Sequence, residues 1–188
     1  IAYFYALALN ERESYKKAAK VLKKLLKSTP SYEQARLQYA FTLDSLKKYK
    51  EMDAQLERVL EQNPKNAPAL NLYAYSLAER GIRLADAQEY AARALAISPE
   101  DNAFIDTQAW IYFKQGQLQK AADLLAVIPP ETVAANLDIA YHWGAVLYGL
   151  GDWDGARKYL EMARREIKEA DKLYKKLPPE KKEAAPDK

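Results

Sequence analysis

The feature that most constrains this chain of 188 residues is an internal repeat with a period of 34 to 35 residues. Small residues recur in one register, at Ala6, Ala40, Ala74, Ala109 and Gly144. Large apolar or aromatic residues recur in the same register, at Leu9, Leu43, Leu77, Tyr112 and Leu147. A further column consists of Ala18, Met52, Ala87, Ala121 and Ala156. Three columns with one spacing predict a chain built from repeated structural units.

Each repeat contains two segments that are expected to form helices. Within 37–41 and again within 56–60, apolar residues are three and four positions apart, which is typical of an amphipathic helix. Pro30, Pro64 and Pro99 close the first three units, because proline cannot continue a helix. A small residue lets two helices approach closely, and a large neighbour fills the space beside it. Since one pair cannot bury both apolar faces, we predict that the pairs stack into a solenoid.

These columns resemble the pattern of the tetratricopeptide repeat (TPR), in which a small residue precedes a large one in the first helix. The clearest segments are 143–147, 151–156 and 70–99, the last with one extra residue near Arg83. The resemblance covers Ile1 to about Arg165. It implies an all-α fold, a right-handed α-solenoid of about five TPR-type antiparallel helix pairs with a C-terminal capping helix.

The expected domain is a TPR solenoid over 1–177, followed by a flexible tail over 178–188. Pro129 and Pro130 are expected to end the second helix of unit four about one turn early. Unit five has no closing proline, so its second helix is expected to run on to Leu177 as a cap, with an apolar stripe of Ile167, Ala170, Leu173 and Tyr174. The units are placed at approximately 1–30, 31–64, 65–99, 100–130 and 131–165, with the capping extension at 166–177.

Composition excludes several classes of site. The chain has no cysteine and one histidine, His142, so no cysteine ligand set, histidine cluster or Ser/His pair can form, and we expect no catalytic residue, metal or cofactor. His142, next to Trp143 in the sequence, is expected to have a structural packing role. No apolar run approaches the roughly 20 residues that span a bilayer. The net charge of +3 comes from the segment that begins at Arg164, which leaves a balanced body with no general attraction to nucleic acid.

The resemblance also implies a binding surface, because the first helix of each TPR unit lines the concave groove. Phe41, Tyr75 and Trp110 follow Leu7 in one column and could form a ladder for a peptide, although packing between helices is the alternative. Acids beside this ladder would favour a basic ligand group, with ordinary solvation as the alternative. The candidate groove residues are Tyr3, Leu7, Asn10, Gln34, Leu37, Phe41, Asp44, Asn71, Tyr75, Glu79, Asp106, Trp110, Phe113, Lys114, Tyr141 and Tyr148.

Two binding modes are disfavoured. TPR proteins that grip the acidic tail of a chaperone use basic and amide side chains, whereas Tyr3, Leu37 and Phe41 stand at those positions here. Lysines at 16, 20, 23 and 27 follow one helical face, which usually indicates a solvated surface rather than a nucleic-acid site.

The expected function is a protein–protein interaction scaffold that binds a peptide or protein partner in a concave aromatic groove, as an adaptor or assembly factor without enzymatic activity. The alternative is a regulatory TPR segment of a larger enzyme or transcription regulator whose active domain is absent from this chain. The third and fourth units also resemble long bacterial repeat proteins, several of them envelope lipoproteins. We therefore expect the bacterial periplasm or envelope rather than the cytoplasm, and a chain cut from a longer protein.

Overall fold

A computed structural model describes residues 1–179, which form helices and turns and contain no strand. The predicted all-α class is therefore confirmed. The chain divides into two compact units, Ile1–Pro99 and the part from Glu100 onward, and each is described by itself.

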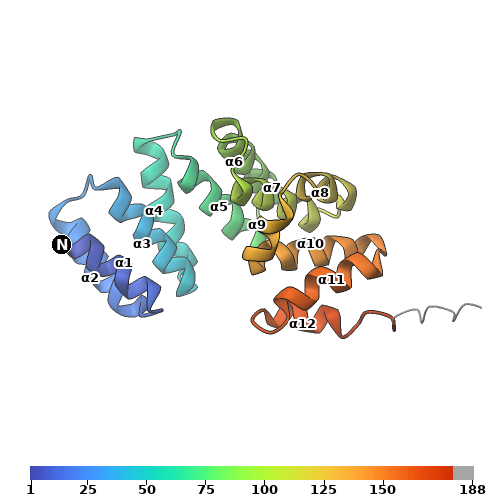
Figure 1. Ribbon diagram of the computed structural model, residues 1–188. Helices are drawn as coiled ribbons and strands as arrows, with labels where there is room; N and C mark the ends of the chain where they lie inside the picture. The colour runs from blue at the N-terminus through green and yellow to red at the C-terminus, as the bar shows by residue number, and fades with distance from the viewer. Residues whose placement is uncertain (180–188) are drawn as a thin grey trace, which may run out of the picture. The chain divides into compact units, whose positions relative to one another are not determined.

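Unit one consists of three helix pairs in which each first helix is joined to its second helix by a short turn (Figure 1). Within the unit, α3 packs against α1 and α5 as well as against α2 and its own partner α4. The first helices therefore lie side by side. The helices are α1 (Ala2–Glu11), α2 (Tyr15–Ser28), α3 (Glu33–Ser45), α4 (Tyr49–Gln62), α5 (Ala67–Arg80) and α6 (Leu84–Ile97).

Unit two contains two helix pairs and two shorter helices. The first pair, α7 with α8, packs on the second pair, α10 with α11, and both short helices also contact α10. Side-chain oxygens of Asp101, Asn136 and Asp152 cap the amino ends of α7, α10 and α11. The helices are α7 (Asn102–Lys114), α8 (Leu118–Leu125), α9 (Pro130–Ala135), α10 (Leu137–Leu150), α11 (Trp153–Ala163) and α12 (Lys168–Tyr174).

The repeated small residues lie where the two helices of a pair touch. Ala6, Ala40, Ala74 and Ala109 are all 0% exposed. At Gly144, a Cβ atom would lie 2.7 Å from the Cγ atom of Leu160 on α11, closer than real contacts allow. The second small column is equally covered, with 0% exposure at Ala18, Met52, Ala87, Ala121 and Ala156. Both columns are therefore buried as the sequence predicted, and at position 144 the paired helices approach closely.

The five first helices of the pairs end in the same backbone motif. In each, an amide N–H reaches back to the carbonyl of the large column residue, as in the bond from Ser14 to Leu9 at 2.8 Å. This is a Schellman cap, which requires a left-handed residue one position earlier. Glycine supplies it at Gly81, Gly116 and Gly151, with φ between 64° and 80°. Glu13 and Lys47 adopt the same conformation, with φ of 54° and 57°, despite their side chains.

The fourth repeat, 100–130, departs from the regular pattern by a shortened second helix and an additional short helix that follows it. Helix α8 ends at Leu125, as the early stop at Pro129 and Pro130 predicted. The sequence interpretation missed α9, which begins at Pro130 before the next first helix. Proline is favourable there because amide groups in the first turn of a helix have no acceptor within the helix, so the missing N–H of proline costs no hydrogen bond.

The predicted continuous helix to Leu177 is wrong. Helix α11 ends at Ala163, and Ile167 adopts an extended conformation (φ −107°, ψ 109°) before α12 begins. Helix α12 then packs against α11 and α10, which buries Ala170 completely. The turn is held by Arg164, whose guanidinium lies 4.0 Å from the ring centroid of Tyr174. Folding back covers apolar surface that a straight extension would leave exposed.

The predicted flexible tail, 178–188, lies outside the described residues from position 180 onward. Among residues 1–179, no helix is both long and apolar enough to cross a bilayer.

The small column yields a test of the helix register. Ala74→Leu should lower the free energy of unfolding by about 1–3 kcal/mol, because the added atoms have no space between α5 and its neighbours. Ala92→Leu, at an exposed position of α6, is the control and should change it by less than about 0.5 kcal/mol. Equal effects in urea denaturation would contradict the assigned contact.

The left-handed turns yield a second test. Lys47→Gly should raise the free energy of unfolding by about 0.5–1 kcal/mol, because relief of left-handed strain exceeds the entropy that glycine adds to the unfolded chain. Lys50→Gly, within α4, should lower it by about 1 kcal/mol. A loss of stability in both variants would show that the turn carries no strain.

Candidate functional site

The predicted groove residues of unit one lie on three helices that pack together. Because α3 contacts both α1 and α5, the helices that carry these residues are adjacent. We call this set of predicted groove residues the first-helix face. It comprises Tyr3, Leu7 and Asn10 of α1, Gln34, Leu37, Phe41 and Asp44 of α3, and Asn71, Tyr75 and Glu79 of α5.

A repeated hydrogen bond joins successive first helices. The Nδ2 atom of Asn10 donates to Oγ1 of Thr42 at 2.9 Å, and Oγ of Ser76 donates to Oδ1 of Asp44 at 2.9 Å. Asp44 lies one repeat after Asn10, and Ser76 lies one repeat after Thr42. Unit one therefore uses the same pair of repeat positions twice to join neighbouring first helices. Asn10 and Asp44 therefore stabilise the stack, a role that the sequence interpretation did not assign to them.

The environment of Asp44 affects its charge. Burial raises the pKa of this carboxyl above the ordinary 3.8, and the hydrogen bond from Ser76 and the nearby Arg80 oppose the rise. The charged form is therefore less favourable here than in water. Asp44 is therefore less readily ionised than an aspartate in water, and a ligand would meet a carboxylate whose charge burial disfavours.

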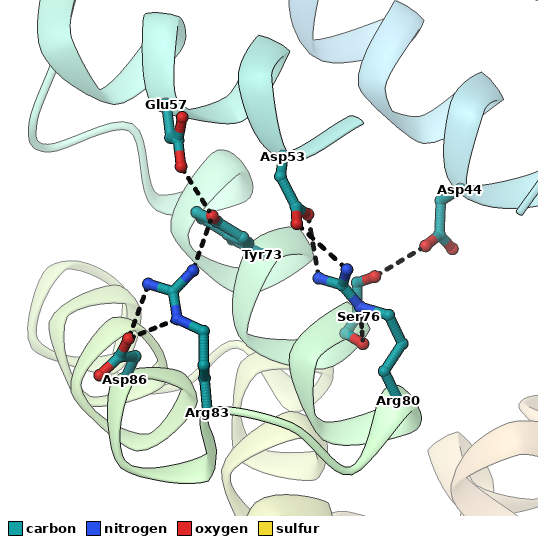
Figure 2. Close-up of polar contacts among 8 residues, drawn as sticks. All are labelled: Asp44, Asp53, Glu57, Tyr73, Ser76, Arg80, Arg83 and Asp86. Atoms are coloured by element: carbon teal, nitrogen blue, oxygen red, sulfur yellow. Dashed lines mark hydrogen bonds and ion pairs between the residues drawn. The ribbon is translucent and has the colours of Figure 1, made fainter. Parts of the chain in front are cut away.

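Polar contacts extend from this face to the second helices of the unit (Figure 2). Arg80 forms a two-pronged ion pair with Asp53 of α4, with N–O distances of 2.9 and 3.1 Å. This pair is only partly exposed, and a planar guanidinium suits such a carboxylate contact. The network therefore holds α5 against α4.

A second branch of the network centres on Tyr73. Its hydroxyl donates to Oε1 of Glu57 at 3.1 Å, and Nη1 of Arg83 donates to the hydroxyl oxygen at 3.4 Å (Figure 2). Burial raises the pKa of Tyr73 to about 12, so the phenol stays protonated. The hydrogen bond with Asp86 raises the pKa of the Arg83 guanidinium. At neutral pH, Tyr73 therefore stays neutral and Arg83 stays positively charged, and both side chains act as structural ties.

The aromatic column behaves differently at each position. Phe41 is 46% exposed at the middle of α3, whereas Leu7 and Tyr75 are half-buried at the equivalent positions of α1 and α5. Trp110 belongs to unit two and is only 2% exposed. The packing alternative therefore describes Trp110, and the exposed part of the predicted ladder is Phe41.

In unit two, Trp110 is surrounded by other predicted groove residues. Its ring stacks on Phe113 at 4.7 Å and on His142 at 4.0 Å, and Nζ of Lys114 lies 5.0 Å from its centroid. Tyr141 tilts against the same ring at 5.6 Å. These contacts build a core rather than an open platform. Tyr148, farther along α10, lies edge-on to Trp153 at 5.3 Å.

Asp106 and His142 form a buried pair between α7 and α10. The Nδ1 atom of His142 lies 3.0 and 2.9 Å from the two carboxylate oxygens of Asp106, and the residues are 1% and 6% exposed. The expected packing role of His142 is confirmed, because the residue is buried and its ring stacks on Trp110, whereas the neighbouring Trp143 stacks on Tyr159 at 5.7 Å. Asp106 is therefore committed to an internal contact.

Two exposed aromatic residues were missed. Phe4 and Tyr5 of α1 are 70% and 57% exposed, and neither belongs to the register columns that define the predicted groove. The repeat register does not indicate this exposure, since Tyr39 and Tyr73, at the positions equivalent to Tyr5, are buried.

The part of the chain that the structure describes contains no group of three or more histidine, aspartate or glutamate residues placed to hold a metal ion. Four acids of unit one are instead paired with serine, arginine or lysine, namely Asp44, Asp53, Asp86 and Glu51.

Two family models match the chain. Residues 9–75 match the model of the tetratricopeptide repeat, and residues 81–163 match that of subunit 3 of the anaphase-promoting complex, or cyclosome. A TPR repeat-containing protein of Pseudomonas aeruginosa is 36% identical over 67 residues, which are 34% of this chain and 11% of that protein. The chain thus spans about a ninth of the length of this relative.

Solved structures show the same fold. PilW, described as a widely conserved type IV pilus biogenesis factor, is similar with a TM-score of 0.73 and 22% identity over 89% of this chain and 77% of PilW. YrrB, described as a TPR protein with an unusual peptide-binding site, has a TM-score of 0.62 and 18% identity over 93% and 90% of the two chains. At these identities the likeness concerns the fold alone.

The raised pKa of Asp44 yields a test. Asp44→Asn keeps an oxygen that accepts from Ser76 but removes a charge that burial disfavours, so it should raise the free energy of unfolding at pH 7. A raised carboxyl pKa gives stability that is full below the unfolded value and is lost as pH rises through the folded value. The gain should therefore disappear as the pH falls below 3.8.

Glu61→Gln, which removes an exposed acid of α4, is the control for the loss of one negative charge. Urea titrations of both variants at several pH values provide the measurement. A pH-independent gain for Asp44→Asn would refute the electrostatic explanation.

Proposed function

We propose that this chain, which is a tetratricopeptide-repeat protein, binds a peptide or protein partner on the first-helix face of unit one and has no catalytic activity of its own. Adjacent helices carry this face, and the hydrogen bonds of Asn10 with Thr42 and of Asp44 with Ser76 fix the positions of these helices. A fixed surface loses little conformational entropy when a partner binds. The fold therefore suits an adaptor or assembly factor.

The exposure of Phe41 is the observation that carries the proposal. A phenylalanine with 46% exposure at the centre of a packed helix leaves apolar area in water, which contact with a partner would remove. Half-buried Leu7 and Tyr75 occupy the equivalent places on the neighbouring helices. Aromatic side chains at the centre of a patch, framed by less exposed neighbours, are typical of binding hot spots.

Polar groups around Phe41 indicate what the partner would carry. Gln34 and Glu79 are exposed on the same face, and Asp44 is half-buried. Asn71 is half-buried, and its Oδ1 atom is covered and has no hydrogen-bond partner in the described chain. We expect an apolar side chain over Phe41 and a basic group or amide donor beside it.

Similar proteins are consistent with this proposal. PilW is described as a pilus biogenesis factor, and YrrB is described as having a peptide-binding site, although an unusual one. By analogy we propose a role in assembly, with the bacterial periplasm or envelope as its location. The alternative of a regulatory segment in a larger enzyme or transcription regulator stays a prediction. A leader peptide with a lipidated cysteine in the full gene would support the envelope, and a cytoplasmic full-length protein would contradict it.

A matched pair of variants tests the face. Phe41→Ala should remove the partner in affinity capture from the native host and weaken its measured affinity by at least about tenfold, because a central aromatic anchor typically contributes 2 kcal/mol or more. Ile97→Ala truncates a side chain of similar exposure, 43%, on α6 and should leave binding unchanged.

Circular dichroism should show the same helicity for both variants and for the wild type. A partner that binds Phe41→Ala as well as the wild type would place the interaction elsewhere. Loss of helicity in Phe41→Ala would instead show that this side chain stabilises the stack.

A further inference from the structure

A basic cavity lies on another side of unit one, between α2, α3 and α4. It has a volume of about 610 Å³. Its lining residues are Lys23, Leu26, Lys27, Pro30, Arg36, Tyr39, Lys50, Glu51, Ala54, Gln55 and Arg58. A second cavity of about 470 Å³ shares Lys23, Tyr39 and Glu51 and continues along the same helices. We call the two together the basic groove.

The charge of the basic groove is one-sided. Lys23, Lys27, Lys50 and Arg58 surround the first cavity, and further lysines at 16, 20 and 48 line the second. Glu51 is the one acid among these lining residues, and it already accepts a hydrogen bond from Lys48 at 2.8 Å. Walls of a single sign concentrate a positive potential in the hollow between them.

Arg36 contributes to the groove a buried positive charge whose hydrogen-bond acceptors in the described chain include no carboxylate. The residue is only 6% exposed, and its guanidinium donates to Oε1 of Gln55 at 2.8 Å and to the carbonyl oxygen of Pro30. Both acceptors are neutral, and the Nε atom has no hydrogen-bond partner within the described chain. Burial, and then the charge of Arg58, lower the pKa of Arg36.

Physical chemistry makes this arrangement unusual. A buried charge loses its hydration and is normally compensated by an opposite charge. Here the surrounding charges are mostly of the same sign, and they raise the free energy of the charged Arg36 side chain. An anion in the cavity would restore the missing attraction without having to reach the covered Nε atom.

The apolar part of the lining favours one kind of anion. Leu26, Tyr39, Leu43 and Leu46 are buried or half-buried between the basic side chains, so the groove presents hydrocarbon as well as charge. Tyr39 is the aromatic residue of the lining, and at 6% exposure it cannot stack on a base, which single-stranded nucleic acids generally require. Carboxylates on a chain with apolar side chains match both features.

We infer that the basic groove binds an acidic segment of a partner protein, with aspartate or glutamate carboxylates beside Arg36, Lys23 and Arg58. The site is separate from the first-helix face, because Arg36 and Tyr39 of α3 line the groove whereas Leu37 and Phe41 belong to that face. The proposal therefore does not rest on the proposed function.

Neighbouring lysines of α2 supply a matched test. Lys23 lines both cavities, while Lys24 lines neither and is also exposed. The probe is a fluorescein-labelled synthetic peptide of repeating Asp-Glu-Leu, measured by anisotropy at low salt. Lys23→Glu and Arg58→Glu should weaken its binding at least about tenfold, whereas Lys24→Glu, with the same change in net charge, should weaken it by no more than about twofold.

Three further measurements test the same site. Glu51→Gln removes the acid of the groove and should tighten binding of the peptide. In the wild-type protein, the Nε–H nuclear magnetic resonance signal of Arg36 should shift as the peptide is added. Phe41→Ala should leave the peptide affinity unchanged, which separates this site from the first-helix face.

Several outcomes would overturn the inference. These are no saturable binding of the acidic peptide, equal binding of the matching Asn-Gln-Leu peptide, or equal losses for Lys23→Glu and Lys24→Glu. Tighter binding of single-stranded DNA with the same dependence on Lys23 would assign the groove to nucleic acid instead. Circular dichroism of each variant ensures that lost binding is not lost folding.

Discussion

Close contact between paired helices at positions without a bulky side chain is the constraint on which this structure depends. Alanine at 0% exposure, or glycine at position 144 where a Cβ atom would strike Leu160, lets the two backbones approach. The large residue of the next column begins the Schellman cap, so the same few positions fix both the helix contact and the turn that follows. Repetition of this local solution gives each unit its regular pairs.

Because the pairs use one stripe of each helix for packing, other stripes remain available. Helix α3 in unit one shows this most clearly. Its inner residues, Ala40 and Leu43, are buried, while Phe41 is exposed on one side and Arg36 borders a cavity on another. One helix thus contributes to an apolar aromatic surface and to a basic groove. Surfaces of such different chemistry suit two different partner segments.

The predicted groove residues divide according to their surroundings. Equivalent positions in the repeat suggested equivalent roles, yet Phe41 is exposed and Trp110 is enclosed by Phe113, His142 and Lys114. Register identifies which side of a helix a residue is on. It does not identify the neighbours, which in unit two include the Asp106–His142 pair against Trp110.

The sequence by itself determined the all-α class, the paired helices, the buried small columns and the early end of α8. These follow from local rules, since spacing, proline and glycine act within a helix or its adjoining turn. Only the tertiary structure decided that α12 folds back, that Asn10 and Asp44 join neighbouring helices, and that lysines expected on a solvated face border a cavity with Arg36. Those outcomes depend on contacts between residues in different helices. The free energies of such contacts cannot be derived from the pattern within one segment.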